Sequence, residues 1–396
     1  MRKGKICQLK KSWIVKVSIL IFLFLCVCFV GMVYYSETHS SVSPSEDLTI
    51  SERVPIEYSA RIFMVGDALI HSSIYQAAKQ SDGSYDFRSM LEYIKPIALK
   101  YDLKYYNQET ILGGASLGYS NYPRFNSPQE VGDAFIDAGF NLVSLATNHT
   151  MDKGEVGVIN SVNYWKSKEN VVFSGQWTSS EERETAEIHE INGIKYAFFS
   201  YTTWTNGLNT PSGKEYLNNV YSDEKAKTDI EKVKDKVDVI IVAMHWGNEY
   251  SHGVSASQTN IANYLSSLGV NLIIGAHPHV VEPVEYINDG KTFVIYSLGN
   301  FISDQVGIER LTGLMMEVTI KKVIDIDDSV TISIENPKAE LIYTKSNNSR
   351  ERDFKVYLYS QLNNNLLPNY MGYYEKYKGI VSSRYQDLVW GVTGEW

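Results

Sequence analysis

Cysteine is scarce in this chain and is confined to its beginning. The three cysteines among the 396 residues are Cys7, Cys26 and Cys28. Everything that follows residue 28 therefore lacks a disulfide, a cysteine nucleophile and a cysteine-ligated zinc site.

Positive charge is also in short supply. The chain has 37 Lys and Arg residues against 46 Asp and Glu residues, and six of the basic residues lie within the first 16 positions. The remainder carries 31 basic and 46 acidic residues, a formal charge near −15. Because nucleic-acid binding relies on Lys and Arg contacts to phosphate, this balance disfavours nucleic acid as a partner.

One long apolar run occurs, at residues 14–35, and it carries no charge after Lys16. A helix needs about 20 apolar residues to cross a bilayer, whereas the core of a cleaved signal peptide has ~7 to 15 residues followed by small ones. No Ala-x-Ala follows this run, and the Leu-Phe-Leu before Cys26 lacks the small residues expected before a lipid-attachment cysteine. We therefore expect an uncleaved signal anchor at residues 14–35.

The flanks of this run set the expected topology. Basic residues beside a membrane span stay in the cytoplasm, so residues 1–13 are expected to be a cytoplasmic tail and the C-terminal part to be extracellular. Residues 36–57 are polar and are expected to be a flexible tether. The sequence thus predicts a single-pass protein of the cell membrane.

The stretch from Asn271 to Val281 contains an apolar run, a glycine, and then His277 and His279 on either side of Pro278. A continuous apolar run is typical of a parallel strand buried on both faces, and functional residues of α/β sheets collect beyond the carboxyl ends of such strands. In extended backbone, residues i and i+2 point to the same side, so both imidazoles would reach one small centre. That geometry suits a metal ion, although two histidines in a loop can also be simply solvated.

The same arrangement recurs along the chain, because several predicted strands end in residues that can bind metal. Five strand ends supply Asp67; Glu109; Asn148 with His149; His245; and His277 with His279. Taken singly, each has an ordinary explanation, such as a helix cap for Asp67. Taken together, carboxylate, amide oxygen and imidazole are the ligand set of a divalent metal site. The ligands suffice for two ions if one carboxylate bridges them.

Two more polar residues follow these candidates closely in sequence. His149 could protonate a leaving group while Asp152, three residues later, orients its ring. Asp152 could equally be an acidic residue at a helix start. Glu249, four residues after His245, could support a ligand or belong to the surface.

Six motifs occur in order between about residues 60 and 305. They are Gly66-Asp67, Asn107-x-Glu109, Asn148-His149-x-x-Asp152, His245-Trp246-Gly247-x-Glu249-Tyr250, Gly275-x-His277-Pro278-His279 and Ser297-Leu298-Gly299-Asn300-Phe301. This set resembles the signature of the CapA family, the poly-gamma-glutamate capsule synthesis proteins of the calcineurin-like metallophosphoesterase superfamily.

The resemblance implies an α/β fold, a four-layer α-β-β-α sandwich of two mixed sheets over residues 58–345, here preceded by one transmembrane helix. It also implies a dinuclear centre, for which manganese, iron and zinc are the candidate ions. By this resemblance Glu109 would bridge the ions, Asp67 and His279 would bind one of them, and Asn148, His245 and His277 would bind the other.

The chain departs from the wider superfamily at one position. A histidine usually stands two residues after the first aspartate, where this chain has Leu69, and the nearest histidine is His71. We expect either a more weakly held ion or a substitution by His71.

Two classes of function are compatible with these residues. The first is a membrane-anchored extracellular protein of poly-gamma-glutamate capsule biosynthesis that hydrolyses a phosphoester with its metal ions. The second is a non-catalytic scaffold that partners the membrane subunits of a polymer synthase. A third, an amidase acting on the polymer, would use the same metals to polarise a carbonyl group.

Two features of the chain bear on substrate and boundaries. The acidic exported part would repel an anionic polymer unless metals or a local basic group such as Arg124 intervened. Residues 346–396, which are rich in tyrosine, are expected to form a helical C-terminal extension.

Overall fold

The structure is a computed structural model and describes residues 23, 25–28, 54–346 and 353–391. The chain divides into two units, Met1–Val54 and Pro55–Trp396. In the first unit, residues 23 and 25–28 are helical; the remainder of the predicted anchor at 14–35, and the predicted tail at 1–13, lie outside the described residues. Among the residues that are described, no helix is both long and apolar enough to cross a bilayer.

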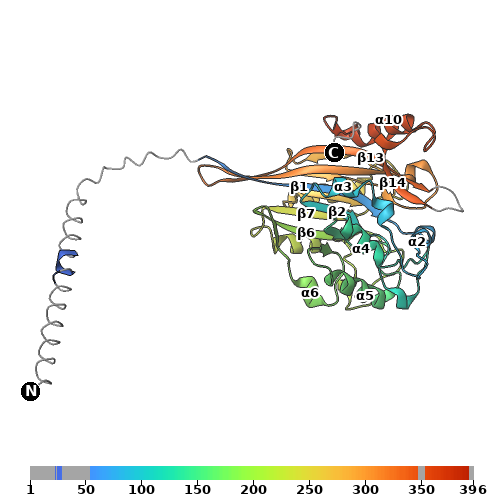
Figure 1. Cartoon of the computed structure of the whole chain (residues 1–396), viewed down its shortest axis with the longest axis horizontal. Helices are drawn as coiled ribbons and strands as arrows, with labels where there is room; N and C mark the ends of the chain where they lie inside the picture. The colour runs from blue at the N-terminus through green and yellow to red at the C-terminus, as the bar shows by residue number, and fades with distance from the viewer. Residues whose placement is uncertain (1–22, 24, 29–53, 347–352, 392–396) are drawn as a thin grey trace, which may run out of the picture. The chain divides into compact units, whose positions relative to one another are not determined.

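Two mixed β-sheets form the centre of the second unit (Figure 1). The larger sheet has the strand order β14-β13-β12-β1-β2-β3-β4, with β11 beside β1 and β15 beside β13. Its strands are β1 (Ile56–Ala68), β2 (Leu103–Asn107), β3 (Leu142–Ser144), β4 (Val172–Ser174), β11 (Asn300–Ile302), β12 (Thr312–Ile324), β13 (Val330–Ser346), β14 (Phe354–Leu358) and β15 (Val389–Trp390). β1 runs parallel to β2 and antiparallel to β12, which makes the sheet mixed.

The second sheet has the strand order β5-β6-β7-β8-β10-β9. Its strands are β5 (His189–Ile191), β6 (Ile194–Thr202), β7 (Val239–His245), β8 (Leu272–Ala276), β9 (Val284–Ile287) and β10 (Thr292–Ile295). The four strands β6, β7, β8 and β10 run parallel to one another. The edge strands β5 and β9 each pair antiparallel with their neighbour. β7 and β8 are buried along their whole length, as their continuous apolar runs predict.

Short helices connect these strands. The α-helices are α2 (Ser72–Ala78), α3 (Lys95–Ala98), α4 (Glu130–Asp137), α5 (Gly154–Lys166), α6 (Ser180–Glu184), α7 (Asp223–Glu231), α8 (Ala256–Ser267), α9 (Ile308–Leu311) and α10 (Tyr370–Val381). The 3-10 turns are η1 (Arg88–Leu91), η2 (Ala115–Leu117), η3 (Glu215–Leu217), η4 (Tyr359–Gln361) and η5 (Ser382–Arg384). The last turn of the serine-capped helix α8 leads directly into β8.

Alternate residues of β1 face two different cores, as the period of two in a strand requires. Ile62 packs in the core between the two sheets, with Ile241 of β7. Phe63 packs on the opposite face, with Phe135 of α4. A third core lies between the second sheet and the helices α7 and α8. The predicted α/β fold with two mixed sheets is confirmed, and the two sheets pack face to face.

Residues 353–391 differ from the helical extension expected for residues 346–396. β14 pairs antiparallel with β13 and β15 pairs parallel with it, so this segment extends the larger sheet. Its helical part is α10 with the turns η4 and η5, and α10 lies beside β13 (Figure 1). Tyr374 and Tyr377 of α10 are buried in the core between the sheets. These tyrosines therefore contribute to packing.

Candidate metal centre

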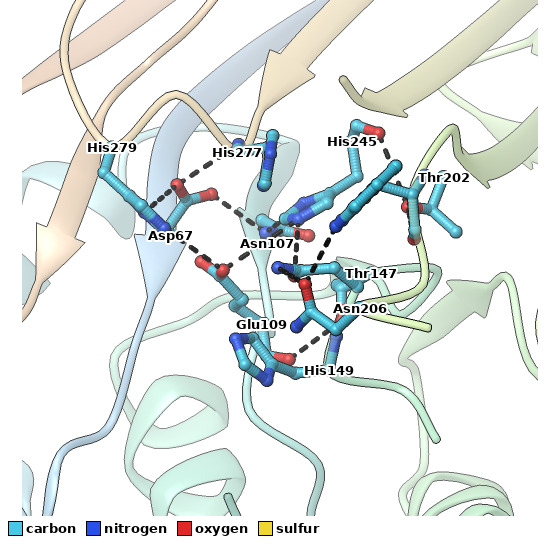
Figure 2. Close-up of polar contacts among 12 residues, drawn as sticks. Asp67, Asn107, Glu109, Thr147, His149, Thr202, Asn206, His245, His277 and His279 are labelled. Atoms are coloured by element: carbon cyan, nitrogen blue, oxygen red, sulfur yellow. Dashed lines mark hydrogen bonds and ion pairs between the residues drawn. The ribbon is translucent and has the colours of Figure 1, made fainter. Parts of the chain in front are cut away.

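The carboxyl ends of strands from both sheets meet at one place and bring six predicted ligands together, of which Figure 2 labels all but Asn148. The larger sheet supplies Asp67 near the end of β1, Glu109 after β2 and Asn148 after β3, and the second sheet supplies His245 at the end of β7 with His277 and His279 after β8. Each of the six is at most 5% exposed. Carboxyl ends of parallel strands share one edge of a sheet, which explains the convergence.

Glu109 is the most unusual group of this cluster. Its side chain is buried, and neither carboxylate oxygen has a hydrogen-bond partner. Oε1 lies 3.5 Å from Nε2 of His279 and 3.9 Å from Nε2 of His245. Burial raises the pKa of Glu109 well above its ordinary range. A buried carboxylate without donors is costly unless a cation neutralises it, so this position fits a metal ligand.

Glu109 belongs to two sets of three potential ligands. The first consists of Glu109, His245 and His277, and the second of Asp67, Glu109 and His279. Within each set the ligand atoms lie within 4.8 Å of one another. Two sets that share one carboxylate are what a bridged pair of ions requires, and their oxygen and nitrogen donors suit borderline divalent metals.

Neighbouring side chains hold these ligands in place. The Asn107 amide donates to Oδ1 of Asp67 at 2.9 Å, and Ser144 Oγ donates to Oδ1 of Asn107 at 2.7 Å. On the other side, Asn300 Oδ1 lies 3.0 Å from Nδ1 of His279. A hydrogen bond that fixes one ring nitrogen leaves the other for a metal, a common arrangement around metal-binding histidines.

The histidine loop has a different backbone from the one expected. His277 and His279 have φ angles of 96° and 59°, in the left-handed region, so the extended geometry assumed for this segment is wrong. The backbone N–H of His277 donates to Oδ2 of Asp67 at 3.3 Å, and Pro278 accepts from Tyr250 N–H at 2.8 Å. Non-glycine residues persist in this region only when surrounding contacts hold them there, and such residues cluster at functional sites.

The environment favours imidazoles that can bind a cation. Burial lowers the pKa of His277 to about 3 and that of His245 well below its ordinary value, so both rings are neutral. Burial also opposes a charge on His279, but Glu109 and Asp67 outweigh it and raise the pKa of His279 to about 9. The two carboxylates that hold this proton are the groups that would hold a metal ion in its place.

Asn148 faces His245 from the other sheet. Its Oδ1 lies 2.9 Å from Nε2 of His245, and its amide nitrogen donates to Oδ1 of Asn206 at 3.3 Å. Asn206, which Figure 2 shows near His245, belongs to the segment after β6, so this loop fixes the Asn148 amide with its oxygen toward His245. Asn148 can therefore add an oxygen ligand beside His245.

His149 lies next to the cluster and makes a close pair with Asp152. Nδ1 of His149 is 2.7 Å from Oδ2 of Asp152, and the same oxygen accepts the backbone N–H of Phe125 at 2.7 Å. The Phe125 ring meets the His149 ring edge-on, with ring centres 4.8 Å apart. Aspartate and phenylalanine thus fix the orientation of His149, with Nδ1 engaged by Asp152.

A cleft of about 440 Å³ opens above these residues. Its walls include His149 and His279, one arginine, one glutamate and several aromatic side chains. The charged residues are Arg124 and Glu249, and the aromatic ones are Tyr122, Phe125, Trp204 and Tyr250. The cleft therefore connects the predicted metal ligands with the surface.

His71 is not part of any potential ligand set among the described residues. Its Nδ1 lies 3.1 Å from the Leu69 carbonyl and 3.3 Å from the backbone N–H of Asp304. Burial lowers its pKa to about 4, and its ring lines the cleft beside Phe125. The proposed substitution of His71 at the Leu69 position is therefore not seen in this arrangement.

Comparison with known proteins gives one family and several relatives. Residues 61–305 match the family described as "Bacterial capsule synthesis protein PGA_cap". The chain is 27% identical over 187 residues to the PGA biosynthesis protein CapA of Bacillus subtilis (strain 168), covering 47% of this chain and 48% of that protein. It is 25% identical over 258 residues to the capsule biosynthesis protein CapA of Bacillus anthracis, covering 61% of this chain and 59% of that protein. The matches thus span about half of the length of one relative and about three fifths of the other.

Solved structures give a weaker likeness. The calcineurin-like phosphoesterase YfkN of Bacillus subtilis is 15% identical with a TM-score of 0.42, covering 72% of this chain and 91% of that one. A phosphatase of Mycoplasma pneumoniae is 15% identical with a TM-score of 0.44, covering 73% of this chain and 95% of that one. At such scores, the case for the site rests on the chain's own residues.

Proposed function

This chain belongs to the PGA_cap family of bacterial capsule synthesis proteins, and we propose that it is a metal-dependent phosphoester hydrolase acting in poly-gamma-glutamate capsule biosynthesis. One observation carries the proposal above all others: Glu109 is buried, neither of its carboxylate oxygens has a hydrogen-bond partner, and it is shared by two potential ligand sets. A buried carboxylate with a purely structural role normally accepts hydrogen bonds from neighbouring donors. A carboxylate that bridges two metal ions uses both oxygens for the ions and needs no such donors.

The proposed ions would be held as follows. Asp67, Glu109 and His279 would bind one ion, and Glu109, Asn148, His245 and His277 would bind the other. Manganese, iron and zinc suit this mixture of oxygen and nitrogen donors. Two such ions would supply Lewis-acid polarisation of a phosphoryl group and charge to neutralise its oxygens.

The chain's own residues supply the remaining functions. His149 would donate a proton from Nε2 to the leaving-group oxygen, and the pair that Asp152 makes with Nδ1 would keep the ring in this orientation. Arg124 lines the cleft, and among described residues its guanidinium makes no ion pair, so it is available to an anionic substrate. The exported part as a whole is acidic and would repel an anionic polymer. Arg124 and the proposed metal ions would offset this repulsion locally, because they lie where the substrate would bind.

We further propose that residues 14–35 anchor the protein in the cell membrane, with the second unit outside the cell. The apolar composition of this run and its basic flank support the proposal. Membrane subunits of a polymer synthase are the partners that such an anchor would bring within reach.

Metal content and turnover test the proposal together. The full-length chain is purified, incubated with manganese, and compared with Glu109→Gln by elemental analysis and by hydrolysis of bis(p-nitrophenyl) phosphate. We expect about two equivalents of metal and measurable turnover in the wild type, and loss of both in the variant, because the shared ligand is gone.

The opposite outcomes are equally informative. Folded wild-type protein that takes up no manganese, iron or zinc would overturn the dinuclear centre and favour a scaffold role. Two bound ions without phosphodiester turnover, but with cleavage of a gamma-glutamyl amide, would favour the amidase instead.

A further inference from the structure

Glu249 forms a third potential ligand set at the edge of the proposed centre. It lies with His277 and His279, and their ligand atoms are within 4.8 Å of one another. His277 is 5% exposed, and its Nδ1 has no hydrogen-bond partner. Glu249 itself is exposed and lines the cleft, so its carboxylate approaches the histidines from the open side.

The turn that carries Glu249 is hydrogen-bonded to the loop of residues 277–279. It follows β7, and Tyr250 N–H donates to the carbonyl of Pro278, the residue between His277 and His279. Tyr250 is itself in the left-handed region, with a φ of 65°. The guanidinium of Arg310 lies 4.1 Å from the centre of the Tyr250 ring and holds that side chain.

Gly247 makes the same turn possible from its other end. Its φ is 88°, and a Cβ at this position would lie 2.8 Å from Nε2 of Gln258. Gln258 is buried and cannot move freely, because its amide also donates to Glu282 Oε2 at 2.6 Å. Several contacts therefore restrain the backbone of residues 247–250. Such restraint of a strained backbone is common at functional sites and unusual for a surface turn that has no functional role.

The two proposed ions differ in the number of ligands that reach them. Asn148 places an oxygen beside His245, so one ion would have four protein ligands. The ion held by Asp67, Glu109 and His279 would have three, since the Leu69 side chain has no ligand atom and Nδ1 of His71 lies beside the Leu69 carbonyl and the Asp304 N–H.

We propose that Glu249 is an additional protein ligand of the metal centre, which binds the His279-held ion from the cleft side. This inference rests on the proposed function, because it presupposes the ions. Its carboxylate already lies within 4.8 Å of the ligand atoms of His277 and His279, on the side of the cleft. A carboxylate there also adds a third negative charge, with Asp67 and Glu109, against the charge of two divalent cations.

Manganese binding to the full-length chain provides the test. Metal-stripped protein is titrated with Mn²⁺, and free Mn²⁺ is followed by its electron paramagnetic resonance signal. Loss of a residue that only supports a ligand typically costs about 10- to 100-fold in affinity. For Glu249→Gln we therefore expect one of the two equivalents to bind about 100-fold more weakly, and the other to change little.

Two further variants separate ligation from simple charge. Glu249→Asp keeps the charge but shortens the reach, so a direct ligand predicts weakened binding there too. Glu169→Gln, an exposed glutamate beyond the end of α5, removes the same charge elsewhere and should bind Mn²⁺ as the wild type does. Circular dichroism on each variant establishes that the fold is kept.

The outcomes distinguish this inference from the proposed function. Wild-type affinity in Glu249→Gln, with two ions still bound, would overturn the ligand and leave the hydrolase intact. Weak binding in Glu249→Gln but normal binding in Glu249→Asp would also overturn it, because charge alone would then suffice. A wild type that binds no Mn²⁺ would instead overturn the proposed function on which it rests.

Discussion

Single residues at the centre differ in the role proposed for them: some would bind a metal ion, and others would act on the leaving group. Asp152 accepts from His149 and from the backbone of Phe125 through one oxygen, and it is 4% exposed. Its carboxylate therefore orients the imidazole, and it belongs to none of the potential ligand sets among the described residues. Removal of its charge should weaken proton donation and leave the ions in place.

For Asp152→Asn we expect kcat to fall about 10²-fold with an alkyl phosphodiester, within the range for loss of general acid catalysis. The loss should be much smaller with a p-nitrophenyl ester, because p-nitrophenolate leaves without a proton. Steady-state kinetics on both esters, with metal content as the control, measure this. An equal loss on both esters, or a loss of metal, would contradict the assignment of His149 as the acid.

A second single-residue effect concerns stability and pH. Glu282 is buried, accepts from Gln258 at 2.6 Å through Oε2, and has no partner for Oε1. Burial raises the pKa of this carboxyl to about 8. In an unfolded chain a glutamate has a pKa of about 4.3, so between these values the folded state retains a proton that the unfolded state releases.

Because the folded state binds more protons over that range, this group makes the free energy of unfolding fall as pH rises from about 4.3 to 8. Glu282→Gln should remove that slope and be more stable than the wild type at pH 8 by more than about 1 kcal/mol. Urea unfolding at pH 5, 6, 7 and 8 measures it, with the exposed Glu190→Gln as control. A difference between Glu282→Gln and wild type that does not grow with pH would refute the prediction.

At the scale of elements, β8 holds the histidine loop, and its glycine sets how closely its neighbours approach. A Cβ on Gly275 would lie 1.8 Å from the Tyr296 carbonyl oxygen and 2.7 Å from Nε1 of Trp246. The first of these atoms belongs to the backbone and the second to a buried ring, so neither can give way easily. Any larger residue must displace β8 from the chain beyond β10.

Gly275→Ala should therefore cost about 2–4 kcal/mol of unfolding free energy, as overpacked or strained core positions do. It should also weaken Mn²⁺ binding, because His277 and His279 follow β8 directly. Gly379→Ala is the matched control: it lies in α10 with nothing within 4 Å of the added Cβ, and should stabilise by up to about 1 kcal/mol. Urea unfolding and Mn²⁺ titration of both variants check these expectations, and a neutral Gly275→Ala would disprove them.

Elements also show what sequence could and could not predict. Apolar runs that end in Asp, His or Asn predicted the strands β1, β7 and β8 and also the ligands at their ends. A local sequence pattern is enough to predict such a strand, and the strand's direction is enough to predict where the ligand lies. The left-handed backbone at His277 did not follow, because it depends on Asp67, which is 210 residues away. Nor did β14, whose five residues acquire strand structure from pairing with β13.

The contributions of Asn300 and Glu249 were similarly hidden. Asn300 was noticed as part of a motif, but its bond to His279 requires β11 to lie beside β1. Glu249 could be either a supporting or a surface residue by sequence. Its position beside His277 and His279 depends on the turn that Gly247 and Tyr250 make. Contacts between distant segments are the common cause of both gaps.

At the scale of the whole molecule, the centre is assembled from two sheets and depends on the packing between them. Residues 353–391 take part in this packing although they lie beyond the matched family region at 61–305. Tyr359, Tyr374 and Tyr377 belong to the core between the sheets, and Phe354 belongs to the core on the helix-covered face. The C-terminal segment therefore contributes to both faces of the larger sheet.

Truncation after residue 346 should for this reason prevent stable folding. It removes β14 and α10, and it exposes β13 along Ile342–Ser346, where β14 pairs. Loss of a single large buried side chain costs about 3–5 kcal/mol, and a domain's whole stability is about 5–15 kcal/mol, so loss of several cannot be tolerated. Near-ultraviolet circular dichroism and urea unfolding should show no cooperative transition, and Mn²⁺ should bind weakly.

A chain ending at residue 391 keeps every described element and should behave as the wild type. If the chain ending at 346 unfolds cooperatively and binds Mn²⁺ normally, residues 346–396 are a separate extension, as their sequence alone suggested.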